Sequence, residues 1–252
     1  MCYDIKSSLR SQLKRAKHYG NEALIKEIEE KIIKHTDLPI YHRQGHSHPK
    51  LLIYTNEQPE LPVVSRWGLI PSWTKTAADA VKISKMTLNA KGETIYEKPS
   101  FRNAAKRKRC LVYLDGFYEH HHYNGKTYPF YIYPANQEPL IAAGLWEEWV
   151  DQSTGEILHT FTIVTTTGNS LLAKIHNNPK LKEPRMPVLL TEANADLWLS
   201  TGEDKTITAS LIQEGNTQQL NYHTVNRLRG KNYPGNIPEI ADKHLYEELD
   251  FE

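Results

Sequence analysis

A cysteine follows the initiator methionine directly, and the only other cysteine of the 252-residue chain is Cys110. Removal of Met1 would leave Cys2 with two nucleophiles on neighbouring carbons, an α-amine and a thiol. Their ordinary pKa values, roughly 7.7 to 8.0 and about 8.5, leave both groups partly deprotonated near neutral pH. An aldehyde that meets this pair forms an imine, which the thiol closes into a stable thiazolidine ring. Cys2 is therefore either an ordinary residue near the terminus or a site that captures aldehydes.

Three later segments carry residue types that are unusual for a structural core. Asn89 stands in "LNAKGETI", Glu119 in "LDGFYEH", and both His176 and Arg185 in "KIHNNPKLKEPRMPVLL". An asparagine side chain offers both a donor and an acceptor, a partly buried glutamate can transfer a proton, and histidine titrates near neutral pH. Each residue taken alone is more often structural, so the prediction of a catalytic site depends on their occurring together.

Aromatic and basic residues suggest contact with unpaired nucleic acid. Trp67 and Trp73 flank a glycine and a proline in "SRWGLIPSW". Such tryptophans either fill a core or offer a surface on which bases stack, which contributes about 1 to 3 kcal/mol per base. Basic runs that could follow a phosphate backbone comprise Arg102, Lys106, Arg107, Lys108 and Arg109, and then Arg227, Arg229 and Lys231. Solvated surface charge is the alternative interpretation of both runs.

The histidine triplet 120–122 invites a comparison with metal sites. Successive residues of a strand point to opposite faces, so only His120 and His122 could share an ion. Two histidines do not make up a usual zinc set. We therefore predict no metal and no cofactor.

The pattern of apolar residues predicts an α+β fold. Residues 7–35 show the spacing of helices with one buried face, with a break at Gly20-Asn21. Strands are predicted at 51–55, 62–70, 110–123, 126–134, 140–150 and 157–167, with hairpins at Asn124-Gly125 and at 151–156. Helices are predicted at 191–200, with Thr191 as the cap, and near 207–215, before a polar surface strap at 232–252. We expect mostly antiparallel sheets that form a partly closed barrel-like core, with peripheral helices and a single domain over 1–252.

Charge and composition narrow the class of protein. Lys and Arg number 31 against 30 Asp and Glu, so any nucleic-acid surface must be local. No stretch approaches the ~20 apolar residues that span a bilayer, and the first thirty residues lack the apolar run of a signal peptide. Two cysteines cannot form a disulfide framework of the secreted kind. We expect a monomeric, cytoplasmic protein that does not bind membranes.

Taken in order, these segments resemble those of the SOS-response-associated peptidase family, also called the abasic-site processing proteins. The resemblance rests on the terminal cysteine and on "WGLIPSW", "NAKGET", "CLVYLDGFYEH", "RMPVLL" and "YHTVNRLRG". It implies covalent capture of abasic sites in single-stranded DNA, through a thiazolidine between the terminal cysteine and the ring-opened sugar. It also implies autoproteolytic removal of Met1.

The resemblance also implies roles for individual residues. Cys2 would be the nucleophile and the link, Asn89 would hold the terminal amine, Glu119 would be the acid/base, and His176 would assist opening of the sugar. The DNA-binding residues would be Trp67, Trp73, Lys91 and Arg185.

The chain departs from the family pattern in several places. Tyr3-Asp4 replaces the usual Gly-Arg after the cysteine, so that an anion stands where a cation is typical. Lys91 replaces an arginine, and the insertion "NNPKLKEP" separates His176 from Arg185. The position of His176 therefore depends on how the insertion folds.

Two other functional classes fit parts of the same sequence. An N-terminal cysteine also suits a peptidase or amidohydrolase, in which the amine acts as base and the thiol attacks an amide. A noncatalytic single-strand DNA binder would need only the tryptophans and the basic runs. The first alternative predicts turnover of an amide substrate, and the second predicts salt-sensitive binding without a covalent adduct.

Overall fold

A closed ring of five strands forms the centre of the computed structural model, which describes residues 3–20, 22–215 and 217–251. The larger sheet has the strand order β11-β10-β4-β3-β6-β9-β12, and a further pairing of β10 with β9 closes the barrel. The only parallel contact in the ring joins β4 to β10. The barrel strands are β3 (Lys50–Thr55), β4 (Val63–Trp67), β6 (Arg109–Leu114), β9 (Leu140–Val150) and β10 (Ile157–Thr167). Shorter strands at its margin are β5 (Asn89–Lys91), β11 (Arg185–Pro187) and β12 (Leu189–Leu190).

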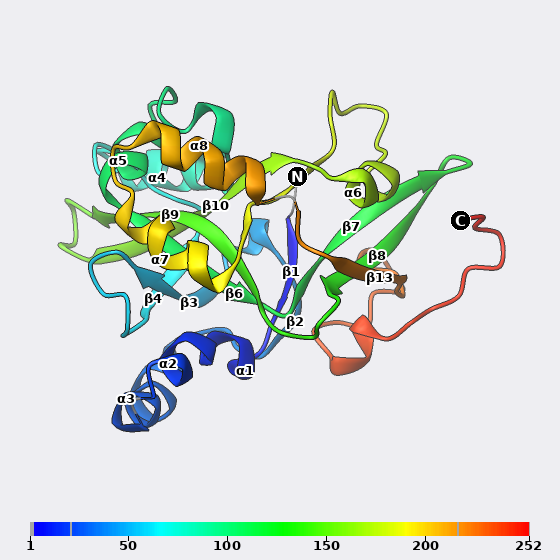
Figure 1. The fold of residues 1–252 in the computed structure, drawn as a ribbon, viewed down its shortest axis with the longest axis horizontal. Coiled ribbons are helices and arrows are strands. Elements are labelled where there is room, and N and C mark those ends of the chain that lie inside the picture. The colour runs from blue at the N-terminus through cyan, green and yellow to red at the C-terminus, as the bar shows by residue number, and fades with distance from the viewer. Residues whose placement is uncertain (1–2, 21, 216, 252) are drawn as a thin grey trace.

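A second, fully antiparallel sheet lies beside the barrel, to the right in Figure 1. Its strand order is β13-β8-β7-β1-β2. The strands are β1 (Asp4–Ser7), β2 (Ile40–Gln44), β7 (Gly116–Tyr123), β8 (Lys126–Pro134) and β13 (Leu220–Thr224). The N-terminal strand therefore pairs on one side with β2 and on the other with β7. The expected α+β class and the mostly antiparallel barrel are confirmed.

The hairpins form where the sequence predicts them. Asn124 and Gly125 both have positive φ, 47° and 72°, as a type I′ turn requires, and they join β7 to β8. The run 110–123, predicted as one strand, is divided at Asp115 between the two sheets. The carboxylate of Asp115 accepts a hydrogen bond of 2.8 Å from the Ser8 hydroxyl, which ties this crossing point to the N-terminal segment.

Helices cover the outside of the barrel (Figure 1). The segment predicted at 7–35 forms α1 (Leu9–Gln12), α2 (Lys14–His18), α3 (Glu22–Glu27), a π-helical turn (Ile28–Ile32) and a 3-10 turn (Ile33–His35). Gly20 has φ +64° at the predicted break, whereas Asn21 lies outside the described residues. The remaining helices are α4 (Ala77–Ser84), α5 (Arg102–Arg107), α6 (Ser170–Ile175), α7 (Glu192–Ser200) and α8 (Lys205–Glu214). Thr191 caps α7 as predicted, since its hydroxyl accepts from the Asn194 N–H.

The C-terminal residues pack against the second sheet, as the predicted surface strap. The strap contains a 3-10 turn at Pro238–Ala241, and the rings of Tyr246 and Phe251 lie 5.0 and 4.6 Å from those of Tyr128 and Phe130. Within the ranges that the structure describes, no helix is both long and apolar enough to cross a membrane.

Cys110 belongs to the apolar core of the barrel. It is fully buried, and burial raises the pKa of its thiol well above the ordinary value. A thiol of this kind is inert as a nucleophile. Any thiol chemistry of this protein therefore belongs to Cys2.

Gly116 offers a test of the crossing between the two sheets. A Cβ at this position would lie 2.5 Å from the Ile132 carbonyl oxygen and 2.6 Å from the Tyr131 ring. We expect Gly116→Ala to lower the free energy of unfolding by about 1–3 kcal/mol, because β8 must shift to admit the methyl group. Urea unfolding measures this change. An unchanged free energy of unfolding in Gly116→Ala would show that β8 admits the methyl group without moving.

Candidate functional site

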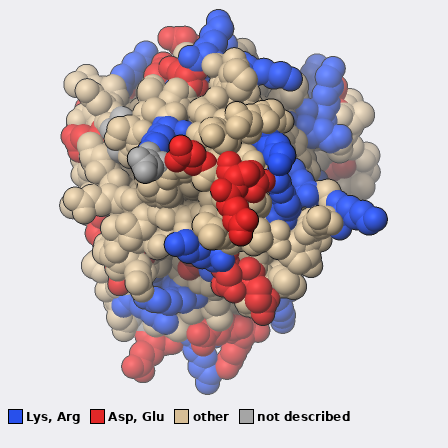
Figure 2. Space-filling view, turned by 90° about the vertical axis from the view of Figure 1, so that its right-hand side faces the viewer, with Lys and Arg blue, Asp and Glu red and all other residues tan. Residues whose placement is uncertain are grey.

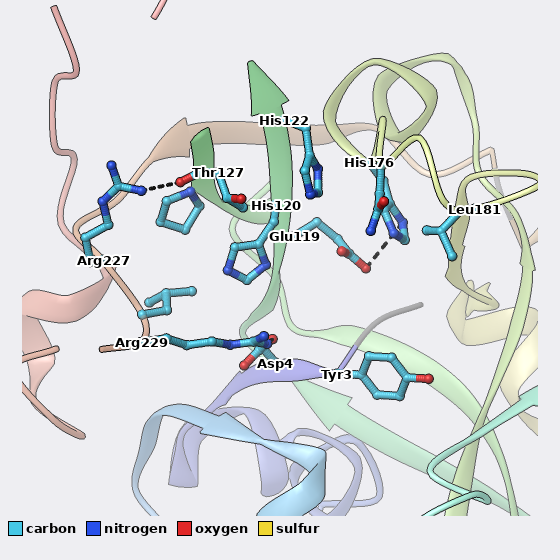
Figure 3. Close-up of a pocket in the computed structure, with 13 residues that line it drawn as sticks. Tyr3, Asp4, Glu119, His120, His122, Thr127, His176, Leu181, Arg227 and Arg229 are labelled. Atoms are coloured by element: carbon cyan, nitrogen blue, oxygen red, sulfur yellow. Dashed lines mark hydrogen bonds and ion pairs between the residues drawn. The ribbon is translucent and has the colours of Figure 1, made fainter. Parts of the chain in front are cut away.

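A cavity of about 530 Å³ opens between the start of β1, the strand β7 and the segments after α6 and β13 (Figure 3). The strand β8 also contributes, so five parts of the chain supply the wall, and most of the side chains are polar. The lining residues are Tyr3, Asp4, Glu119, His120, His122, Thr127, Pro129, His176, Asn178, Leu181, Arg227, Leu228 and Arg229.

Glu119 and His176 meet in this cavity. Glu119 belongs to β7, whose register is fixed between β1 and β8, and His176 is the residue at which α6 ends. The carboxylate Oε1 and the imidazole Nδ1 lie 3.6 Å apart, and both side chains are about 6% exposed. The sequence-predicted acid and imidazole are therefore neighbours.

The insertion after His176 folds back on β7. The amide of Asn177 accepts a 2.7 Å hydrogen bond from the His122 N–H and donates one of 2.9 Å to the His122 carbonyl. At the other end of the insertion, Glu183 contacts Arg185 at 3.0 Å and Lys91 at 3.8 Å. Because both ends are anchored, the insertion fixes the end of α6 against β7 and so holds His176 beside Glu119.

Burial sets the protonation states of this pair. It raises the pKa of Glu119 to about 8 and lowers the pKa of His176 to about 4, because each charged form loses solvation. The His176 Nδ1 lies 3.3 Å from the Arg185 carbonyl oxygen, and a carbonyl only accepts, so Nδ1 carries the proton. At neutral pH the cavity therefore holds a protonated carboxyl group and a neutral imidazole whose Nε2 can accept a proton. This pair can act as a general acid and a general base.

Asp4 is held by residues from two other segments, one of which is itself bound by Tyr233. Its carboxylate accepts 2.9 Å from His42 Nε2 and 2.8 Å from Arg229 Nη2, while His42 Nδ1 lies 2.9 Å from the Tyr233 hydroxyl. Burial alone would raise the pKa of Asp4, but the His42 hydrogen bond and the Arg229 charge outweigh it and lower that pKa. Asp4 is therefore ionised, and the first residues of β1 are fixed at the cavity wall.

Cys2 lies outside the described residues, as does Met1. Tyr3, the residue bonded to Cys2, lines the cavity that contains Glu119 and His176. Asn89 is buried on β5, a strand that pairs with β10, and it is not among the described residues that line the cavity.

Trp67 lies in the core, which is one of the two positions that the sequence allowed for it. It is 0% exposed, its indole N–H donates to the Leu88 carbonyl at 2.6 Å, and its ring stacks on Phe161. The expected base-stacking role is corrected accordingly, because no face of this ring is open to a base. Trp73 differs: it is 49% exposed, with its indole N–H 3.4 Å from the Pro99 carbonyl.

Arg185 is likewise buried, and its guanidinium is occupied by protein groups. It donates to both carboxylate oxygens of Glu93, at 2.8 and 2.7 Å, and to the Thr165 carbonyl at 2.7 Å. Lys91 is exposed at the end of β5, which pairs with β10 as the strand of Arg185 also does. A DNA contact through Arg185 would require the pair with Glu93 to open, whereas the exposed Lys91 would need to leave only its 3.8 Å contact with Glu183.

The two basic runs do not form one track. Arg109 is 1% exposed, and its guanidinium binds Tyr96, Gly202 and Thr208. The rest of that run lies in α5 and directly after it, to the left in Figure 1, whereas Arg227 and Arg229 follow β13 on the right. Figure 2 shows the right-hand side, where basic and acidic side chains lie interspersed. Only the run at 227–231 adjoins the cavity.

The network around Asp4 was missed by reasoning from the sequence. Asp4 stood out only as an anion where a cation is typical, and His42 belongs to no motif. Arg229 was seen only as part of a basic run. No group of three or more His, Cys, Asp and Glu residues within the described ranges is arranged to hold a metal ion, so His120 and His122 have no third protein ligand there.

The barrel, the second sheet and the buried acid–imidazole pair beside the N-terminal strand define an α+β protein with a polar cavity. The family model described as "SOS response associated peptidase (SRAP)" matches residues 7–231. Since this is most of the 252 residues, the chain belongs to that family.

Curated relatives and a solved structure agree with this assignment. The chain is 37% identical over 182 residues to "Abasic site processing protein YoqW" of Bacillus subtilis, covering 71% of this chain and 75% of YoqW. It is 34% identical over 194 residues to "Abasic site processing protein HMCES" of Xenopus tropicalis, covering 69% of this chain and 55% of that protein. A crystal structure from Bacteroides thetaiotaomicron superimposes with a TM-score of 0.80 at 33% identity, covering 97% of this chain and all of the other.

Proposed function

We propose that this protein captures abasic sites in single-stranded DNA through a thiazolidine link to Cys2, after removal of Met1. Membership of the SRAP family and the names of the curated relatives support a role in abasic-site processing. The observation that carries the proposal is the Glu119–His176 pair, which shares its cavity with Tyr3, the neighbour of Cys2.

Opening of the sugar requires an acid and a base. His176 Nε2 takes the proton of the anomeric hydroxyl while protonated Glu119 delivers its own to the ring oxygen, so that the ring C–O bond breaks and an aldehyde forms. The protonation states that burial imposes on the pair are the ones that these steps need.

Covalent capture then follows at Cys2. The α-amine attacks the aldehyde carbon and water leaves, which gives an imine. The thiol adds across this C=N bond, its sulfur to carbon and its proton to nitrogen, and closes the thiazolidine. In this proposal Asn89 holds the α-amine of Cys2, and Trp73 and Lys91 contact the DNA strand. Capture of the aldehyde withholds it from β-elimination, so the strand is shielded rather than cut.

Incubation with an oligonucleotide that carries one abasic site tests the proposal. We expect a slower band on a denaturing gel, no such band with an undamaged oligonucleotide, and an intact protein mass that lacks Met1. An unshifted band together with turnover of a peptide or amide would instead indicate the amidohydrolase alternative. Salt-sensitive binding without any adduct would reduce the protein to a noncatalytic binder.

A further inference from the structure

We infer that Arg229 is the DNA phosphate contact of this cavity. It supplies the positive charge that the N-terminal strand lacks, because Asp4 stands there in place of the usual cation. The inference rests on the proposed function, because it names a residue that seats the strand at the same site. The ligand is a phosphate of the DNA backbone next to the captured nucleotide.

Arg229 is oriented across the cavity wall by Asp4. Its Nη2 donates 2.8 Å to the Asp4 carboxylate, whose side chain is 3% exposed, while the Arg229 side chain remains 56% exposed (Figure 3). Asp4 is in turn fixed by His42 at 2.9 Å. A guanidinium has five N–H donors in a fixed fork, so one edge can be held by Asp4 while others meet a ligand.

Arg227, the other arginine in the lining, is committed to the protein. It donates to the Thr127 carbonyl and lies 5.4 and 5.2 Å from the ring centres of Tyr128 and Tyr246. These contacts bind it to β8 and to the C-terminal strap. Of the two, Arg229 is therefore the cation that is placed for an anionic ligand.

The charges of the cavity favour an anion. Glu119 is uncharged at neutral pH because burial raises its pKa to about 8, so Asp4 is the ionised acid among the described lining residues. With two arginines present, a positive charge remains after Asp4 is balanced. Arginine forks match the geometry of phosphate oxygens.

The test measures noncovalent binding, with a single-stranded oligonucleotide that carries a tetrahydrofuran analogue of an abasic site. The analogue has no aldehyde, so no adduct can form. We expect Arg229→Gln to weaken binding roughly tenfold at low salt. The slope of log affinity against log salt should fall by about 0.7, which is one phosphate contact to a single strand. Arg229→Lys should keep most of the slope but bind more weakly, because it lacks the fork.

Lys17→Gln on α2 is the matched control, since it removes an equal charge from an exposed position at the other end of the molecule and should change neither quantity. Unchanged affinity and slope in Arg229→Gln would overturn the inference, and Arg229 would then serve only as the ion-pair partner of Asp4. Circular dichroism checks folding; should the glutamine variant unfold, unchanged affinity in Arg229→Lys overturns the inference instead. Capture of a true abasic site by the unmodified protein is scored separately, so failure of the proposed function is recognised independently.

Discussion

Replacement of Cys2 by alanine is expected to abolish the stable DNA adduct completely. The variant retains the α-amine once Met1 is removed, so it can still form an imine with the sugar aldehyde. Without sulfur the imine cannot close into a ring, and it either hydrolyses or proceeds to β-elimination. A denaturing gel should therefore show no shifted protein–DNA band and, over time, a cleaved strand.

Borohydride reduction separates the two nucleophiles of Cys2. It should trap the imine of Cys2→Ala as a permanent link, because reduction converts C=N to a stable amine. Cys110→Ala is the matched control: that thiol is fully buried, and its loss should leave capture intact. A stable adduct in Cys2→Ala without reductant, or loss of capture in a folded Cys110→Ala variant, would contradict the assignment of the nucleophile.

The sequence predicts the elements of this fold that have strong local signals. The hairpin at Asn124-Gly125 needs positive φ at both residues, and few residue pairs other than Asn-Gly tolerate it. The cap at Thr191 is equally local. In contrast, α5 and α6 each span only six residues, which is too short for a clear helical period. The division of 110–123 between two sheets depends on tertiary contacts at Asp115 that no local pattern reveals.

The site was predictable in its motifs but not in its charge network. Glu119 and His176 could be named from their segments, yet their 3.6 Å contact arises because Asn177 binds the His122 backbone across 55 positions in sequence. Trp67 shows a second limit of the sequence. Its segment allowed either a core position or a base-stacking role. In the structure Trp67 lies in the core, where its buried indole N–H donates to the Leu88 carbonyl.

The Asp4 network explains how a departure from the family pattern is accommodated. An aspartate next to the proposed nucleophile would repel DNA if it stood alone. In this protein its charge is balanced by Arg229, from a segment 225 positions away, and its carboxylate is further bound by His42. The net effect is to move the cation from the N-terminal strand to the segment after β13.

Glu119→Gln is expected to slow adduct formation by about 10²- to 10⁴-fold, the range typical of a lost general acid–base group. Glutamine has nearly the same shape but cannot deliver a proton to the sugar ring oxygen. Binding of the tetrahydrofuran analogue should hardly change, because Glu119 is neutral in the native protein at pH 7. Equal losses of binding and rate would show that Glu119 is structural.

The pH profile distinguishes a proton donor from a structural group. In the unmodified protein the rate should rise with pH as the Cys2 amine loses its proton, at roughly 7.7 to 8.0. It should fall again above pH 8, because Glu119 has a pKa of about 8 and its acid form is lost there. In Glu119→Gln the alkaline fall should disappear.

Stability gives an independent check on the same residue. The raised pKa means that the folded protein binds the Glu119 proton more tightly than the unfolded chain does. The free energy of unfolding of the protein should therefore decrease between pH 4.5, the ordinary pKa of a glutamate, and about pH 8. Glu119→Gln removes this decrease, so the variant should be at least as stable as the parent at pH 8. A variant that captures abasic sites slowly while melting no lower has lost chemistry rather than structure.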